Sequence, residues 1–147
     1  MFLATLGNLI DRLIIVRFKW FHKTDKDELI DLEKQIDRLT RDIKVFIEMA
    51  AKGELPEDEI TMLQHKVYNK KGNEVDIDIS GDIGKLIDQL IETNWKMWQT
   101  QDELYNFKAK TPDERDEIIH KTVIHNLERN KLIDAIDTKF KEKLEEK

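Results

Sequence analysis

Two stretches of the chain place amide or carboxylate side chains where a helical pattern calls for apolar ones. In the first, apolar residues recur every three or four positions, and the same spacing includes Asn94 and Gln101. In the second, it includes Asn126, Asn130 and Asp137. A buried amide needs hydrogen-bond partners, because an unsatisfied one costs about 1–3 kcal/mol. These residues therefore predict either a structural network or a ligand site.

The two stretches meet if their helices are antiparallel about a turn near residues 109–110, because position 94 then faces about position 125. We expect Asn94, Asn126 and Asn130 to be largely buried. Their amides can satisfy one another or bond to Arg129. A ligand or metal site between the two helices is the other interpretation, although we assign no metal-ligating residues and predict no cofactor. The residues predicted to bind the ligand are Asn94, Trp98, Asp102, Asn126, Arg129, Asn130 and Asp137.

Paired acids in the last third of the chain suggest a different chemistry. Glu114 with Glu117, and Asp134 with Asp137, are each three positions apart and so share a helix face. All-α nucleotide pyrophosphohydrolases bind Mg²⁺ through such pairs on facing helices. In an acid-rich helix these pairs arise easily. The alternative function is a Mg²⁺-dependent enzyme acting on a phosphorylated small molecule.

Two further metal patterns are incomplete. Residues 76–81 are similar to the start of a calcium loop, but Ile87 stands where a bidentate Glu belongs. Glu117 and His120 have the spacing of a di-iron ligand pair, which requires a second such pair that the sequence lacks. We therefore predict no metal site from either pattern.

Composition restricts the partners and the compartment. The 147 residues are 38% charged and carry a net charge of −6, with the signs interleaved and no basic stripe, which argues against nucleic acid. There is no cysteine, which fits a reducing, cytoplasmic setting. The apolar N-terminal stretch is interrupted by Asn8, Asp11, Arg12 and Arg17, so we expect a buried amphipathic helix and no membrane partner.

The three-four spacing of apolar residues predicts four long helices, over about residues 2–22, 25–52, 82–107 and 111–143. Residues with N-cap chemistry precede three of them: Thr24 or Asp25, Ser80 or Asp82, and Thr111. Thr111, Pro112 and Glu114 have the order of a capping box with proline at the first helical position. Gly53 suits a C-cap.

Residues 54–81 follow another pattern. Pro56 can open a short helical turn. Further on, Val75, Ile77 and Ile79 alternate with acidic residues, which is typical of a strand. Paired with residues 66–68 across a turn, this segment predicts a small β-hairpin.

The start of the chain resembles its middle. Residues 6–25 align without a gap with residues 83–102 at an offset of 77 positions, with eight identities. We interpret this as a duplicated helical hairpin. The predicted fold is an all-α four-helix bundle of two such hairpins, over about 2–52 and 82–143. A small β-hairpin insertion (about 54–81) lies between them, in a single domain of residues 1–147.

Matched charges suggest how each hairpin keeps its register. The repeat places Asp11 and Asp88 at equivalent positions, and Arg38 and Arg129 likewise. In antiparallel hairpins each Asp lies within a helical turn of its Arg. We therefore predict two ion pairs, Asp11 with Arg38 and Asp88 with Arg129, although solvated surface charges would give the same pattern.

The second hairpin also resembles a known family. Its residues have the order Asn94-x-x-Met97-Trp98-x-x-Gln101-Asp102, then Asn126-x-x-Arg129-Asn130, then Asp134 and Asp137. Residues 83–140 are thereby similar to a bacterial all-helical family catalogued as a domain of unknown function. Gln101 departs from that family's pattern, which has Glu there. The resemblance implies a helical fold and no particular activity.

The predicted function is that of a non-catalytic helical-bundle interaction or assembly protein. The helix over residues 2–22 carries more apolar residues than one hairpin can cover. Such an excess indicates either that the helix is central in the bundle or that it forms an oligomer contact. We expect a homo-oligomer through this helix, with another protein as a possible partner.

Overall fold

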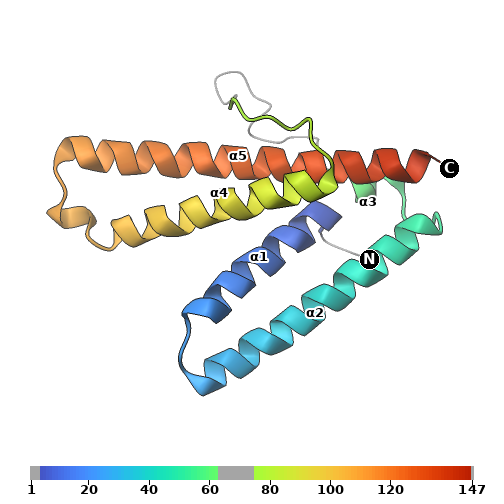
Figure 1. Cartoon of the computed structure of the whole chain (residues 1–147), viewed down its shortest axis with the longest axis horizontal. Coiled ribbons are helices and arrows are strands. Elements are labelled where there is room, and N and C mark those ends of the chain that lie inside the picture. Colours follow the sequence, from blue (N-terminus) through green and yellow to red (C-terminus); the bar gives the residue numbers. More distant parts are fainter. Residues whose placement is uncertain (1–3, 63–74, 147) are drawn as a thin grey trace. The chain divides into compact units, whose positions relative to one another are not determined.

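The structure, a computed structural model, describes residues 4–62 and 75–146. The regular elements of these residues are all helices (Figure 1). The helices are α1 (Leu6–His22), α2 (Lys26–Ala51), α3 (Glu57–Ile60), α4 (Ile83–Leu104), the short 3-10 turn η2 (Phe107–Ala109) and α5 (Pro112–Glu145). No helix of the described part has the length and apolarity needed to cross a membrane.

The chain divides into two compact units, and α5 contributes to both. Unit 1 comprises residues 1–63 together with 133–147, so it contains α1, α2, α3 and the C-terminal part of α5. Unit 2 comprises residues 64–132, so it contains α4, η2 and the first part of α5.

Local capping chemistry starts and ends the helices, as predicted. The Asp25 side chain caps α2, and the Asp82 side chain caps α4 by accepting from the amide three residues on, at 2.9 Å. At α5, the Thr111 amide donates to Glu114 and the Glu114 amide donates to the Thr111 hydroxyl, both at 3.2 Å, which confirms the capping box. Gly53 follows the end of α2 with a φ of 74°, a conformation that favours glycine.

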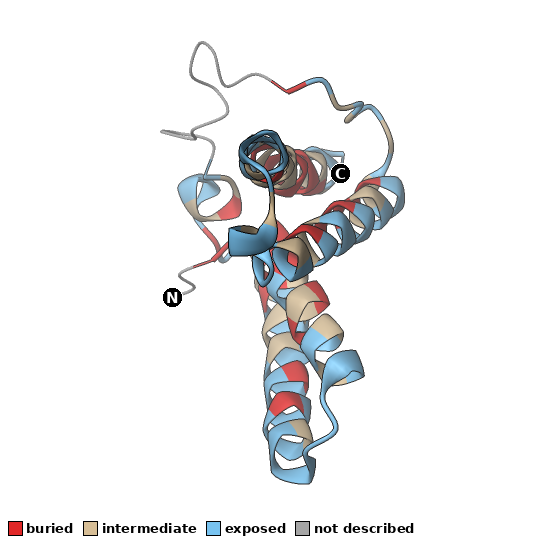
Figure 2. Ribbon diagram, turned by 90° about the vertical axis from the view of Figure 1, so that its left-hand side faces the viewer, coloured by how far each residue is buried: buried red, intermediate tan, exposed pale blue. Residues whose placement is uncertain are grey.

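The core of unit 1 lies between α1 and α2, which form an antiparallel pair. Val16 of α1 packs with Leu32 and Ile36 of α2, and three half-buried residues surround them: Leu13, Trp20 and Leu39. Figure 2 shows buried and exposed residues alternating along both helices, as amphipathic helices require. At the other end of α2, Phe46 is fully buried, and its ring centroid lies 6.2 Å from that of Phe140 on α5.

In unit 2, α4 and the first part of α5 run side by side (Figures 1 and 2). Arg115 stabilises their connection. Its Nε donates to the Phe107 carbonyl at 3.0 Å and its Nη2 donates to the Lys108 carbonyl at 2.8 Å. The guanidinium also lies over the Phe107 ring, 5.3 Å from the centroid.

The structure does not support the β-hairpin insertion. Residues 66–68 and the turn after them lie outside the described residues. Residues 75–79, the other half of the proposed hairpin, are not in a strand. Their alternation appears as burial instead: Val75 is buried and Ile77 and Ile79 are half-buried, whereas the acidic residues between them are exposed.

The four-helix bundle of two hairpins is not supported either. The C-terminal part of the predicted second hairpin, from Ile133 on, belongs to the unit of α1 and α2. A short helix, α3, follows Pro56, as predicted for the start of the insertion. The all-α class is confirmed, and the single domain of residues 1–147 stays a prediction.

α1 and α4 begin 77 positions apart, which is the offset of the sequence repeat. Their N-cap residues, Thr5 and Asp82, each accept a hydrogen bond from the amide of the third helical residue. The second helical residue is glycine in both helices. Gly7 is buried, whereas Gly84 is exposed, so the two helix starts share capping chemistry but not surroundings.

Candidate functional site

The predicted polar site is only partly buried. Asn94 is 5% exposed, as expected, and its Nδ2 donates to the Leu90 carbonyl one turn earlier at 3.1 Å. Asn130 is half-buried, and Asn126 is exposed. The expectation that Asn126 is buried is therefore wrong. Of the other predicted residues of unit 2, Trp98 and Arg129 are half-buried and Asp102 is exposed.

Asn126 is exposed because α5 is long. The burial prediction followed one lane of α5, a line of residues three or four positions apart that runs from Ile119 through Asn126 to Phe140. Such a lane drifts around a straight helix by about 20° every seven residues, or about 60° over this length. It is buried from Ile133 to Phe140 but exposed from Ile119 to Asn126. The lane buried in unit 2 is its neighbour, which runs from Ile118 to Leu132.

The last predicted site residue, Asp137, belongs to unit 1 and not to the unit of the other six. It is 1% exposed, and its Oδ1 accepts a hydrogen bond from the Gly7 amide of α1 at 2.7 Å. Gly7 is the second residue of α1, so its amide has no acceptor within the helix. A carboxylate is favoured here, because the N-terminus of a helix carries partial positive charge.

Glycine is what allows this contact. A Cβ on Gly7 would lie 2.5 Å from the Ile133 carbonyl oxygen and 2.9 Å from Asp137 Oδ1. The backbones of α1 and α5 therefore approach closely at this point. In the sequence repeat Gly7 aligns with Gly84, and no role beyond that match was predicted for it. The available signal was a glycine inside an apolar helix, where it costs about 1 kcal/mol relative to alanine unless close packing requires it.

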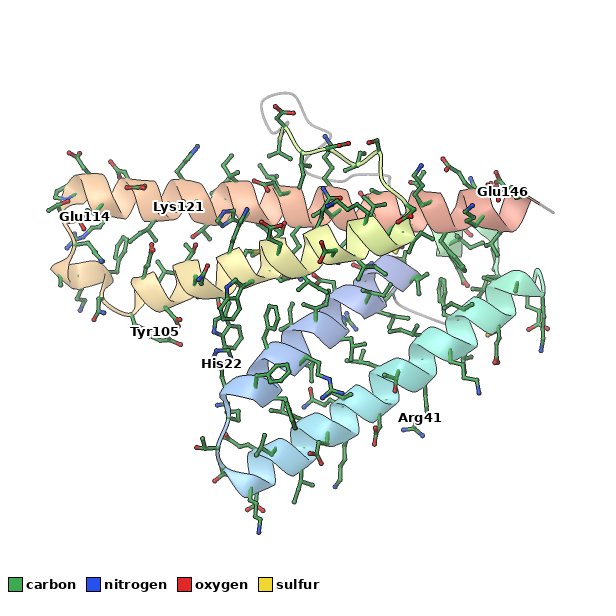
Figure 3. The ribbon with its side chains drawn as sticks, in the orientation of Figure 1. His22, Arg41, Tyr105, Glu114, Lys121 and Glu146 are labelled. Carbon is green, nitrogen blue, oxygen red and sulfur yellow. The ribbon has the colours of Figure 1, made fainter. Side chains whose placement is uncertain are left out.

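The acids of the enzyme alternative are divided between the units. Glu114, at the start of α5 (Figure 3), is exposed, and the Thr111 amide bonded to its carboxylate lowers its pKa. Glu117 is exposed and pairs with Lys121 at 3.4 Å. Asp134 and Asp137 belong to unit 1 and are 2% and 1% exposed. Glu114 and Glu117 thus each have a protein partner, as does Asp137 through the Gly7 amide.

The segment similar to a calcium loop is organised by its own side chains. Asp78 Oδ1 accepts from both the Ser80 amide, at 2.9 Å, and the Ser80 hydroxyl, at 2.6 Å. These two hydrogen bonds lower the pKa of Asp78, and the bond from the hydroxyl has the larger effect. Within residues 4–62 and 75–146, no three His, Asp or Glu side chains are grouped so that they could hold a metal ion.

The burial of the four residues in the predicted Asp–Arg ion pairs does not follow the symmetry of the sequence repeat. Asp11 is 2% exposed, whereas Arg38 points to solvent on α2. Asp88 is exposed and Arg129 is half-buried, and both ion pairs stay predictions. Matched positions in the sequence repeat therefore do not have matched burial, because Asp11 is buried and Asp88 is exposed.

His125 was not predicted as a site residue, yet it lies on the buried lane of α5. It is half-buried, and its Nδ1 is buried without a hydrogen-bond partner among the described residues. Burial lowers its pKa below the ordinary value of 6.5. Among charged groups, Glu128 raises the pKa, whereas Lys96 and Lys121 lower it.

Comparison with known proteins gives no relative. No protein-family model matches the chain, and searches of curated proteins and of solved structures return no significant match. The resemblance of residues 83–140 to a bacterial helical family therefore stays a prediction.

Proposed function

We propose that the protein is a non-catalytic helical interaction or assembly protein that associates with copies of itself. The observation that carries this proposal is an aliphatic pair on α5: Ile119 and Val123 are 52% and 51% exposed. They are four positions apart, so they are neighbours on one helix face. Adjacent exposed aliphatic side chains mark contact surfaces more often than isolated ones do.

The sequence predicted that α1 forms the oligomer contact. In the structure, α1 has little exposed apolar surface for such a contact. Of the described apolar residues of α1, Phe21 is exposed, at 69%, and the others are buried or half-buried. A homo-oligomer through α1 would thus depend on Phe21 at its C-terminal end. The α5 pair and Phe21 are two surfaces that substitution can separate.

Light scattering on the full chain tests the proposal. We expect at least a dimer at high concentration, and Ile119→Lys with Val123→Lys should lower the mass. Phe21→Lys tests the α1 route, and Val45→Lys, at an exposed position of α2, is the matched control. A monomeric wild-type chain would contradict self-association on either surface. A dimer that only Phe21→Lys disrupts would leave the function intact and move the surface to α1.

The partners already held by the acidic side chains support a non-catalytic role. Glu114 caps its own helix, Glu117 pairs with Lys121, and Asp137 accepts from Gly7. A thermal-shift assay with Mg²⁺ or Mn²⁺ and a nucleotide panel checks this. We expect no stabilisation, and a shift that needs both metal and nucleotide would favour the enzyme alternative.

We also propose that the two helix starts descend from one duplicated hairpin. The matched N-caps and glycines of α1 and α4, at the offset of the sequence repeat, support this. Gly7, with its partner Asp137, has become a packing contact, whereas Gly84 remains exposed. We therefore do not expect α1 and α4 to form equivalent contacts in an assembly.

A further inference from the structure

His125 lies where an added proton would be poorly accommodated. It is on the lane of α5 that is buried in unit 2, between Ile118, 4% exposed, and the fully buried Leu132. Its Nδ1 is shielded from solvent and has no partner among the described residues. A neutral imidazole can leave one nitrogen without a hydrogen, but a protonated ring carries a donor on both. Protonation therefore places a donor at Nδ1 with no acceptor.

The charged groups around the ring oppose protonation on balance. From α4, Lys96 faces it, held to Glu92 at 3.4 Å. From α5 itself, Lys121 lies on the N-terminal side and Glu128 on the C-terminal side. Desolvation and the two lysines disfavour the imidazolium, whereas Glu128, alone among these described groups, favours it.

We propose that His125 makes the α4–α5 pair of unit 2 sensitive to acid, so that protonation of this ring loosens the packing of the two helices. The direction follows from linkage. The pKa of His125 is lowered in the folded chain, so the folded state prefers the neutral ring. Its contribution is complete above the ordinary value of 6.5 and is lost as the pH falls from there toward the lower folded pKa. Mildly acidic conditions would thus destabilise the packing of α4 and α5 in unit 2.

A comparison of two histidines on the same helix tests this. The thermal midpoint of the full chain is measured at about pH 7.5 and about pH 5 for the wild type, His125→Leu and His120→Leu. His120 is exposed and serves as the matched control. The loss on acidification should be smaller in His125→Leu than in the wild type by at least about 2 °C, and unchanged in His120→Leu. Equal losses in all three chains would overturn the proposal.

A second measurement does not depend on how well the variants fold. Histidine ring resonances of the wild-type chain are followed by NMR across the same pH range, with hydrogen exchange of the α4 and α5 amides alongside. His125 should titrate below the ordinary value of 6.5, and α4 and α5 should lose protection in step with it while α2 does not. Titration of His125 at or above 6.5, or loss of protection spread equally over all helices, would refute an acid-sensitive α4–α5 pair.

Discussion

Gly7 and Gly84 occupy the same position in their helices, yet a methyl group would meet different surroundings at the two. At Gly7 its nearest neighbour would be the Ile133 carbonyl oxygen at 2.5 Å, whereas at Gly84 it would be Asp82 Oδ1 at 3.5 Å. Gly7→Ala should therefore destabilise the chain by about 1–3 kcal/mol through overpacking. Gly84→Ala should be neutral or stabilise it by up to about 1 kcal/mol. Urea unfolding of both variants measures the difference, and equal effects would rule out the close approach of α1 and α5.

Asp137 provides a second test at the scale of one residue. Asp137→Leu removes the acceptor of the Gly7 amide at a buried helix start, which should cost about 1–3 kcal/mol. Asp137→Asn keeps an oxygen acceptor but loses the charge, so it should cost less. Asp116→Leu, at an exposed position of the same helix, should stay within about 0.5 kcal/mol of the wild type. We expect the free energy of unfolding to fall most in Asp137→Leu, less in Asp137→Asn and least in the Asp116→Leu control. Any other order would contradict a stabilising contact between Asp137 and Gly7.

At the scale of elements, Arg115 should set the stability of the α4–α5 connection. Arg115→Lys keeps the charge but cannot reach both carbonyl oxygens with one planar group. We expect a loss of about 1–2 kcal/mol and faster hydrogen exchange at the Lys110 amide, which donates to the Phe107 carbonyl. Lys108→Met, an exposed neighbour whose backbone carbonyl remains, is the control. Unchanged exchange in Arg115→Lys would show that the turn does not depend on the guanidinium.

The boundaries of the elements were predictable because capping is local chemistry. Asp25, Asp82, Thr111 and Gly53 act on amides or carbonyls within a few positions, so the sequence carries the whole signal. The strand prediction at residues 75–79 used the same kind of local signal. It failed because alternation reports alternating burial, which an irregular segment can also have.

The site was less predictable, for two physical reasons. The polar lane of α5 assumed that spacing holds its direction along a 34-residue helix, and the drift of that lane left Asn126 exposed. The contact of Gly7 with Asp137 joins residues 130 positions apart, and no local pattern encodes such a pairing. Burial of Asn94, whose lane on α4 is shorter, was predicted correctly.

At the scale of the whole molecule, the last residues should stabilise a unit made mostly from the first ones. A chain ending at Leu132 lacks both Asp137 and Phe140, the partners of Gly7 and Phe46. We expect the amides of α1 and α2 to lose most of their hydrogen-exchange protection. A chain ending at Lys143 keeps both contacts and should retain that protection. Equal protection in the two truncated chains would show that α1 and α2 fold without α5.

Because unit 1 is discontinuous, its two ends are made at different times. During synthesis α1 and α2 leave the ribosome first, but residues 133–147 follow only after all of unit 2. Unit 2 is continuous in the chain and can assemble while the rest is still being translated. Until residues 133–147 are synthesised, the ring of Phe46 lacks its contact with Phe140. The first helices to be made would thus be the last to reach their final packing, which gives a chaperone an interval in which to bind them.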